Sequence, residues 1–188
     1  GWLAMHRKNR KAKLVISFPN PKLALERAQV RRAQMRLKKT KAVGETLMRE
    51  YLDVMVEADK YKDDYAPAAL TNPHTNELLD FDRYYVDEHV AVEFNGPQHD
   101  GPTERFPEEV ARKQMERDRI KKEICDRQKI RLVIVRPEDL SYRRLCELLH
   151  GVLPLRELTG NEPIIRFLEE EAARYRAAIE PIRRRAQQ

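Results

Sequence analysis

The sequence is poor in cysteine and contains no long apolar run. Its only cysteines, Cys125 and Cys146, are too few and too far apart for a zinc cluster, and we expect both to be reduced thiols on helices. No run of about 20 apolar residues is present to cross a bilayer, and no segment has the charged start and apolar centre of a signal peptide. We therefore expect a cytoplasmic (intracellular) protein with no membrane partner.

Further absences exclude other classes of site. None of the six glycines belongs to a glycine-rich phosphate loop, which excludes an ATP-driven motor. Four histidines show no ligand spacing with one another or with the cysteines, so we do not expect them to bind a metal. These are His6, His74, His89 and His150. The 188 residues suffice for one medium-sized domain with appendages.

Acidic residues are almost absent from the first 41 positions. This segment contains 13 lysines and arginines and one acid, Glu26, whereas residues 42–160 contain 18 basic and 25 acidic residues. A basic arm attached to an acidic body indicates a polyanionic partner. DNA is the partner we expect, RNA is the alternative, and an anionic membrane is less favoured.

The basic arm is predicted to contain a helix over 22–40, because Pro19 and Pro21 interrupt the segment before it. Cations cover much of this helix, which favours a helix that follows a phosphate backbone over one that is merely solvated. The residues expected to contact nucleic acid are Arg27, Arg31, Arg32, Arg36, Lys38 and Lys39.

The rest of the chain alternates helical and strand patterns. We predict helices at 45–59, 107–128, 139–149 and 161–179, strands at 78–86, 89–95 and 130–135, and a loop at 60–76. The first two strands read as a hairpin, and the apolar run 130–135 is predicted to be a buried central strand. This order implies an α/β fold with a small mixed sheet flanked by helices. It divides into a helical basic arm (1–41), a core (42–150) and a helical C-terminal extension (151–188).

Carboxylates interrupt two of the predicted strands. Because side chains alternate between the faces of a strand, Glu93 lies on the opposite face from Val90 and Val92, and Asp80 and Asp82 share a face. If the strands pair, an aspartate and Glu93 lie side by side and offer two hard oxygen ligands for Mg²⁺ or Mn²⁺. The alternative is an aspartate in water at a sheet edge and Glu93 paired with an arginine.

The segments Leu79 to Asp82 (LDFD) and Val90 to His99 (VAVEFNGPQH) resemble the signature of very-short-patch-repair-like endonucleases, a branch of the PD-(D/E)XK nuclease superfamily. The resemblance covers about residues 42–140. It implies a restriction-endonuclease-like core and a hydrolase that uses Mg²⁺ or Mn²⁺ to cut DNA phosphodiester bonds. Nicking and double-strand cleavage both fit it, as do a monomer and a homodimer.

The resemblance also implies the site residues. Asp82, with Asp80 as the alternative, and Glu93 would hold the metal, and His99 would act as general base with its ring oriented by Asp118 or Glu45. The catalytic residues implied are Glu45, Asp82, Glu93, His99 and Asp118, the last from the helical pair Arg117-Asp118. Gln98 is expected either to bond to a phosphate oxygen or to close the turn.

The sequence departs from the superfamily pattern at Asn95, which stands where a lysine is usual. That lysine is thought to position or activate the attacking water. Either His99 takes over its role, or the site is inactive and the protein only binds nucleic acid. Lys121 and Lys122 are candidates for a cation supplied from a helix, with Lys121 also expected to contact nucleic acid; the alternative is that both pair with acids on the helix surface.

Overall fold

The computed structural model describes residues 20–97 and 108–186. Gln98 and His99 therefore lie outside the described residues. The elements, in chain order, are α1 (Pro21–Lys39), α2 (Val43–Met55), β1 (Tyr61–Tyr65), η1 (Ala68–Leu70), β2 (Phe81–Tyr85), β3 (Val90–Phe94), α3 (Glu108–Gln128), β4 (Arg131–Val135), η3 (Pro137–Asp139), α4 (Tyr142–Leu149) and α5 (Pro163–Ala186).

The sheet is small and mixed, with the strand order β1-β2-β3-β4. β1 and β2 are antiparallel, and so are β2 and β3, whereas β3 and β4 are parallel. A parallel pair needs a long crossover connection, and α3 lies within that connection. The predicted α/β fold, with a hairpin and a small mixed sheet flanked by helices, is confirmed.

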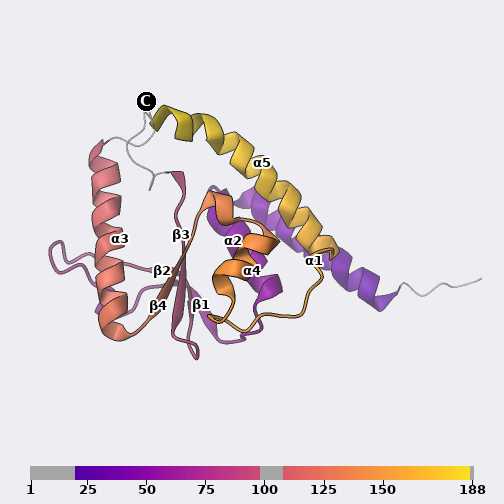
Figure 1. The fold of residues 1–188 in the computed structure, drawn as a ribbon, viewed down its shortest axis with the longest axis horizontal. Helices are drawn as coiled ribbons and strands as arrows, with labels where there is room; N and C mark the ends of the chain where they lie inside the picture. The colour runs from indigo at the N-terminus through magenta and orange to yellow at the C-terminus, as the bar shows by residue number, and fades with distance from the viewer. Residues whose placement is uncertain (1–19, 98–107, 187–188) are drawn as a thin grey trace, which may run out of the picture.

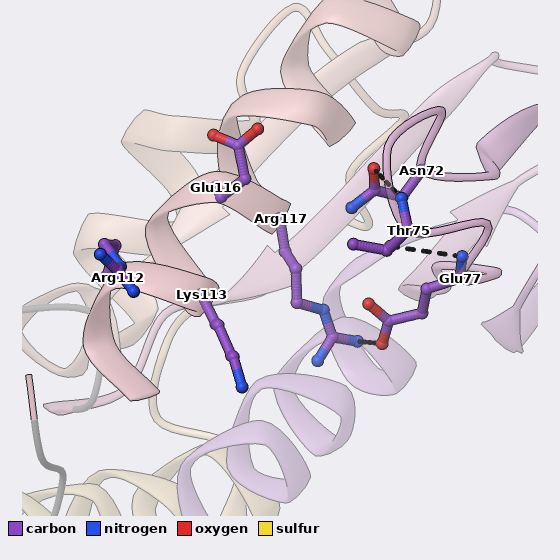
Figure 2. A pocket seen from close by; sticks show the side chains of 7 residues that line it. All are labelled: Asn72, Thr75, Glu77, Arg112, Lys113, Glu116 and Arg117. Atoms are coloured by element: carbon purple, nitrogen blue, oxygen red, sulfur yellow. Dashed lines mark hydrogen bonds and ion pairs between the residues drawn. The ribbon is translucent and has the colours of Figure 1, made fainter. Parts of the chain in front are cut away.

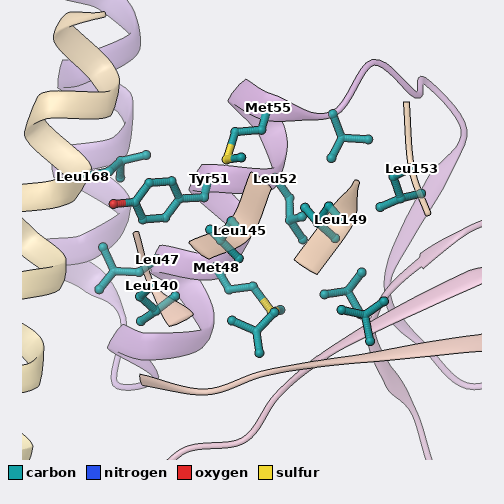
Figure 3. Close-up of a cluster of buried hydrophobic side chains, with 14 of the residues drawn as sticks. Leu47, Met48, Tyr51, Leu52, Met55, Leu140, Leu145, Leu149, Leu153 and Leu168 are labelled. Carbon is teal, nitrogen blue, oxygen red and sulfur yellow. The ribbon is translucent and has the colours of Figure 1, made fainter. Parts of the chain in front are cut away.

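Helices cover the two faces of the sheet unequally (Figure 1). α3 lies on one face, and α2, α4 and α5 lie on the other, with α1 beside α5. The buried side chains follow the same division, because Val90 and Val92 belong to the cluster under α2, α4 and α5, which Figure 3 shows in part. Ala91 belongs to a smaller cluster with Ile120 and Ile124 of α3. The two-residue alternation predicted for this strand is therefore confirmed.

Two expectations about strands were wrong. The segment 60–76, predicted to be a loop, contains η1 and also β1, whose polar sequence YKDDY pairs with β2 through the backbone. The apolar segment 130–135 forms β4, which is an outer strand of the described sheet and not a central one. Helices cover both faces of this strand, which accounts for its apolar composition. A strand can be buried on both faces without having a partner strand on each edge.

The predicted helices are confirmed, with changes at some ends. α2 ends at Met55, four residues before the predicted end, and the next residue, Val56, forms an antiparallel bridge with Leu155. α5 continues to Ala186 and contains Pro181. No helix in the described ranges has an apolar stretch long enough to cross a bilayer.

α1 is packed against the core of the protein. Ala33 is fully buried, and Val30 and Leu37 contact the larger apolar cluster. Arg36 Nη1 lies 2.8 Å from Glu50 Oε1 of α2. The described part of the basic arm is thus held by both apolar contacts and an ion pair.

A candidate active site between two strands and a helix

Asp82 and Glu93 are neighbours across the β2–β3 hairpin. Arg83 pairs with Val92 in this ladder, and extending the antiparallel register by one residue places Asp82 opposite Glu93. Asp82 is further tied to β3, since its Oδ2 accepts a hydrogen bond of 2.7 Å from the backbone N–H of Phe94. The two carboxylates therefore lie side by side beneath α3, as the alternation of the strands predicts.

A lysine from α3 completes this group. Lys121 Nζ donates to both carboxylate oxygens of Glu93, at 3.0 Å each. Lys121 and Glu93 are buried, whereas the next residue, Lys122, is exposed. A cation is thus supplied to Glu93 from a helix, and the alternative expectation of an arginine partner was wrong.

Burial and mutual repulsion make the two carboxylates difficult to ionise together. Burial, followed by the neighbouring Asp82 charge, raises the pKa of Glu93 to about 8 against the opposing effect of Lys121. Burial also raises the pKa of Asp82, which the Phe94 N–H, Lys121 and Arg49 oppose. The site therefore favours any arrangement that adds positive charge between the two groups.

Glu45 adjoins this pair from α2. Burial, followed by the charge of Asp82, raises the pKa of Glu45. Its Oε1 lies 2.7 Å from Arg49 Nη2, and the same nitrogen donates to the backbone oxygen of Asp82 at 3.0 Å and to Asp64 at 2.8 Å. Arg49 therefore ties the predicted helical glutamate to the strand that carries Asp82.

Arg49 was not expected from the sequence. The available signal was its spacing of four residues from Glu45, which on a helix brings a carboxylate and a guanidinium together. That spacing is common on solvated helices. What distinguishes Arg49 is the additional bond to β2, which joins residues 33 positions apart in the sequence.

Two further residues singled out in the sequence lie on α3. Asp118 Oδ1 accepts a hydrogen bond from Gln114 Nε2 at 3.0 Å, and Arg117 Nη2 lies 3.3 Å from Glu77 Oε1. The pair Arg117-Asp118 lies one turn before Lys121 on α3, the helix that covers the site. The catalytic role of Asp118 stays a prediction, as does that of His99.

The cations predicted to contact nucleic acid are largely available on α1. Arg27, Arg31, Arg32, Lys38 and Lys39 are exposed. Arg36 differs, because it pairs with Glu50 and, at 3.3 Å, with Asp53. Lys121 is less accessible to nucleic acid than any of these, since it is buried and paired with Glu93.

The donor atoms of this site suit a small divalent cation, although they are not arranged around one. Asp82 and Glu93 offer hard oxygen ligands of the kind that Mg²⁺ and Mn²⁺ prefer. Within residues 20–97 and 108–186, no group of three or more histidine, cysteine, aspartate or glutamate side chains is placed to hold a metal ion. Both oxygens of Glu93 contact Lys121, so an ion would share this carboxylate with the ammonium group.

Comparison of the chain with protein-family models, with curated proteins and with solved structures finds no match.

Proposed function

We propose that the protein is a divalent-metal-dependent endonuclease that hydrolyses DNA phosphodiester bonds. The observation that carries the proposal is the convergence of Asp82, Glu93 and Lys121 from β2, β3 and α3. Two carboxylates and one ammonium group can serve hydrolysis of a phosphodiester, as oxygen ligands for a metal and as a fixed positive charge. The motif resemblance to PD-(D/E)XK nucleases supports the same reading.

The chain's own residues have distinct parts in this proposal. Asp82 and Glu93 would hold the ion, which polarises the scissile phosphate and acidifies water when bound. Lys121 keeps a positive charge at Glu93 in the place where Asn95 cannot supply one. Arg49 orients Glu45 toward Asp82. His99 is proposed as the general base, since imidazole is the side chain most often used for proton transfer near neutral pH.

DNA binding is proposed to involve the exposed cations of α1. Contacts of this kind depend strongly on salt, because each neutralised phosphate releases counterions. Competition between duplex DNA and structured RNA for the protein distinguishes the two polyanions. Preference for RNA would assign the cations of α1 a different partner without altering the site at Glu93.

The proposal is tested by nicking of supercoiled plasmid in Mg²⁺ or Mn²⁺. We expect Asp82→Asn, Glu93→Gln and Lys121→Met each to lower the rate by about a hundredfold or more, the usual effect of removing one electrostatic group from an active site. The matched controls are Asp87→Asn, on the hairpin turn, and Lys122→Met, beside Lys121 on α3; both residues are exposed. Cutting by Glu93→Gln at the wild-type rate would overturn the assignment of the site.

A second candidate function is nucleic-acid binding without hydrolysis. The specific observation in its favour is that Lys121 already contacts both oxygens of Glu93, so the buried charge is balanced without a metal. DNA affinity in the nanomolar to micromolar range with no nicking in any divalent metal would favour this function over the endonuclease.

A further inference from the structure

A cationic cavity lies between α3 and the loop before β2. Its volume is about 560 Å³. It is lined from α3 by Arg112, Lys113, Glu116 and Arg117, and from the loop by Asn72, Thr75 and Glu77. Figure 2 shows Arg117 reaching from α3 toward Glu77, and Lys113 extending from the same helix, while Glu116 is turned another way.

The loop wall of this cavity is held in one shape by Asn72. This residue is buried, and its Oδ1 accepts hydrogen bonds from the backbone N–H of His74 at 2.9 Å and of Thr75 at 3.3 Å. The backbone N–H of Asn72 also donates to the carbonyl of Glu77 at 2.7 Å. A fixed loop gives Glu77 a defined position, and Glu77 in turn holds Arg117.

Arg117 has an unused donor within this wall. Its Nη2 reaches Glu77 Oε1 at 3.3 Å, but its Nε is buried and has no hydrogen-bond partner among the described residues. A buried N–H without an acceptor costs free energy, so an acceptor at this place stabilises the structure. A guanidinium offers parallel donors that match the oxygens of a phosphate group.

The charge around Arg117 favours an anion. Three cations line the cavity against two carboxylates, and one of these, Glu116, is paired with Arg119 at 2.7 Å. Glu77 is the carboxylate that opposes an anion here, and it is more than a third exposed to water. Lys113 also pairs with Glu109 at 3.0 Å, but this pair is highly exposed and weak.

Both walls of the cavity lead to the candidate active site. Lys113, Arg117 and Lys121 follow one another at four-residue steps on α3, so they share a face at intervals of about 6 Å. The last of the three contacts Glu93. On the opposite wall, the chain passes from Glu77 into β2, which carries Asp82.

We propose that this cavity is a phosphate subsite that binds a backbone phosphate of the nucleic-acid strand, next to the phosphate attacked at Asp82 and Glu93. The position of this subsite relative to the cleaved phosphate rests on the proposed function. Arg117, whose side chain is partly exposed, is the residue that contacts the phosphate through its guanidinium group, and Lys113 adds charge from the preceding turn. The cationic face of α3 then sets the direction in which the strand leaves the site.

The test measures binding without cleavage. A short fluorescent duplex is titrated with the full chain in EDTA at several salt concentrations. We expect Arg117→Gln to weaken binding about tenfold at low salt, the usual loss for a hydrogen bond to a charged group. It also lowers the slope of log affinity against log salt by about one. The control is Arg127→Gln, an exposed residue in the last turn of the same helix that does not line the cavity, which should change the affinity less than about twofold.

A second measurement assigns the effect to one phosphate. Neutral methylphosphonate linkages are introduced one at a time along the duplex, and one of them should weaken the wild type while leaving Arg117→Gln unchanged. If Arg117→Gln does not fold, Lys113→Gln takes its place, because Lys113 is highly exposed. Wild-type affinity and salt slope in the substituted protein would overturn the subsite. A subsite effect without nicking in any metal would retain the subsite and reject the nuclease.

Discussion

The ammonium nitrogen of Lys121 lies 3.0 Å from each carboxylate oxygen of Glu93, although the two residues are 28 positions apart in the sequence. About a tenth or less of either side chain is exposed. Removal of two charges from water is costly, and only close geometry and further bonds offset the cost. Both the stability of the fold and the proposed activity therefore depend on the Lys121–Glu93 pair.

The stability of the protein should fall as pH rises between about 4.5 and about 8. Glu93 has a pKa raised from 4.5 to about 8, so its contribution is fully present below pH 4.5 and is lost as pH rises through 8. The pKa of Asp82 is raised in the same direction. Glu93→Gln should remove a slope of at most about 1.4 kcal/mol per pH unit from the free energy of unfolding. The measurement is urea denaturation of the wild type and of Glu93→Gln across this pH range. The same pH dependence of the unfolding free energy in both proteins would contradict the prediction.

Lys121→Met should destabilise the protein far more than Lys122→Met. The first substitution leaves Glu93 buried without its partner, which costs roughly 3–5 kcal/mol when the carboxylate is ionised. The second changes an exposed residue on the same helix and should stay within about 0.5 kcal/mol. The difference, measured by urea denaturation, should shrink below pH 8, since Glu93 then takes up a proton. Equal effects of the two substitutions would show that Lys121 does not support Glu93.

Arg83→Met should cost roughly 3 kcal/mol of unfolding free energy. Arg83 is 2% exposed and lies 2.6 Å from Asp53 and 2.7 Å from Asp63, with its guanidinium 4.0 Å over the ring of Tyr61. It thereby joins α2, β1 and β2. Arg83→Lys should not restore stability, because an ammonium cannot bond to both carboxylates in this geometry. Arg143→Met is the control, as Arg143 is 85% exposed, and thermal unfolding should not separate it from the wild type.

Gly44→Ala should destabilise the protein through lack of space. A Cβ at this position would overlap the ring of Phe94 and lie 2.7 Å from the hydroxyl of Tyr175, which predicts a cost of roughly 1–3 kcal/mol. Gly151→Ala meets no atom within 4 Å but has φ of +69°, so its cost of about 1 kcal/mol comes from the backbone. Phe94→Leu should therefore relieve Gly44→Ala and leave Gly151→Ala unchanged in double-mutant denaturation experiments. Relief of both substitutions would argue against a steric cause.

Local patterns in the sequence were enough to predict most of the elements and one half of the candidate site. The alternation in Val90–Phe94 placed Glu93 on the face opposite Val90 and Val92, and the adjacent hairpin brought Asp82 beside it. The face of Glu93 and the hairpin follow from the two-residue period of a strand and from short connections, which act between neighbours in the chain. The choice of Asp82 over Asp80 came from the family resemblance. The polar strand β1 was missed because it pairs through backbone groups that every residue carries, and its side chains are mostly exposed.

The other half of the candidate site was decided by tertiary structure. Lys121 and Lys122 are adjacent and lie in the same helical pattern, so the sequence allowed either to supply the cation; the rotation and position of α3 over the sheet bury one and expose the other. Arg36 was predicted as one of six equivalent cations, but packing of α1 on α2 pairs it with Glu50. In both cases a buried carboxylate, Glu93 or Glu50, takes its cation from a distant segment, and tertiary packing decides which of several similar cations reaches it.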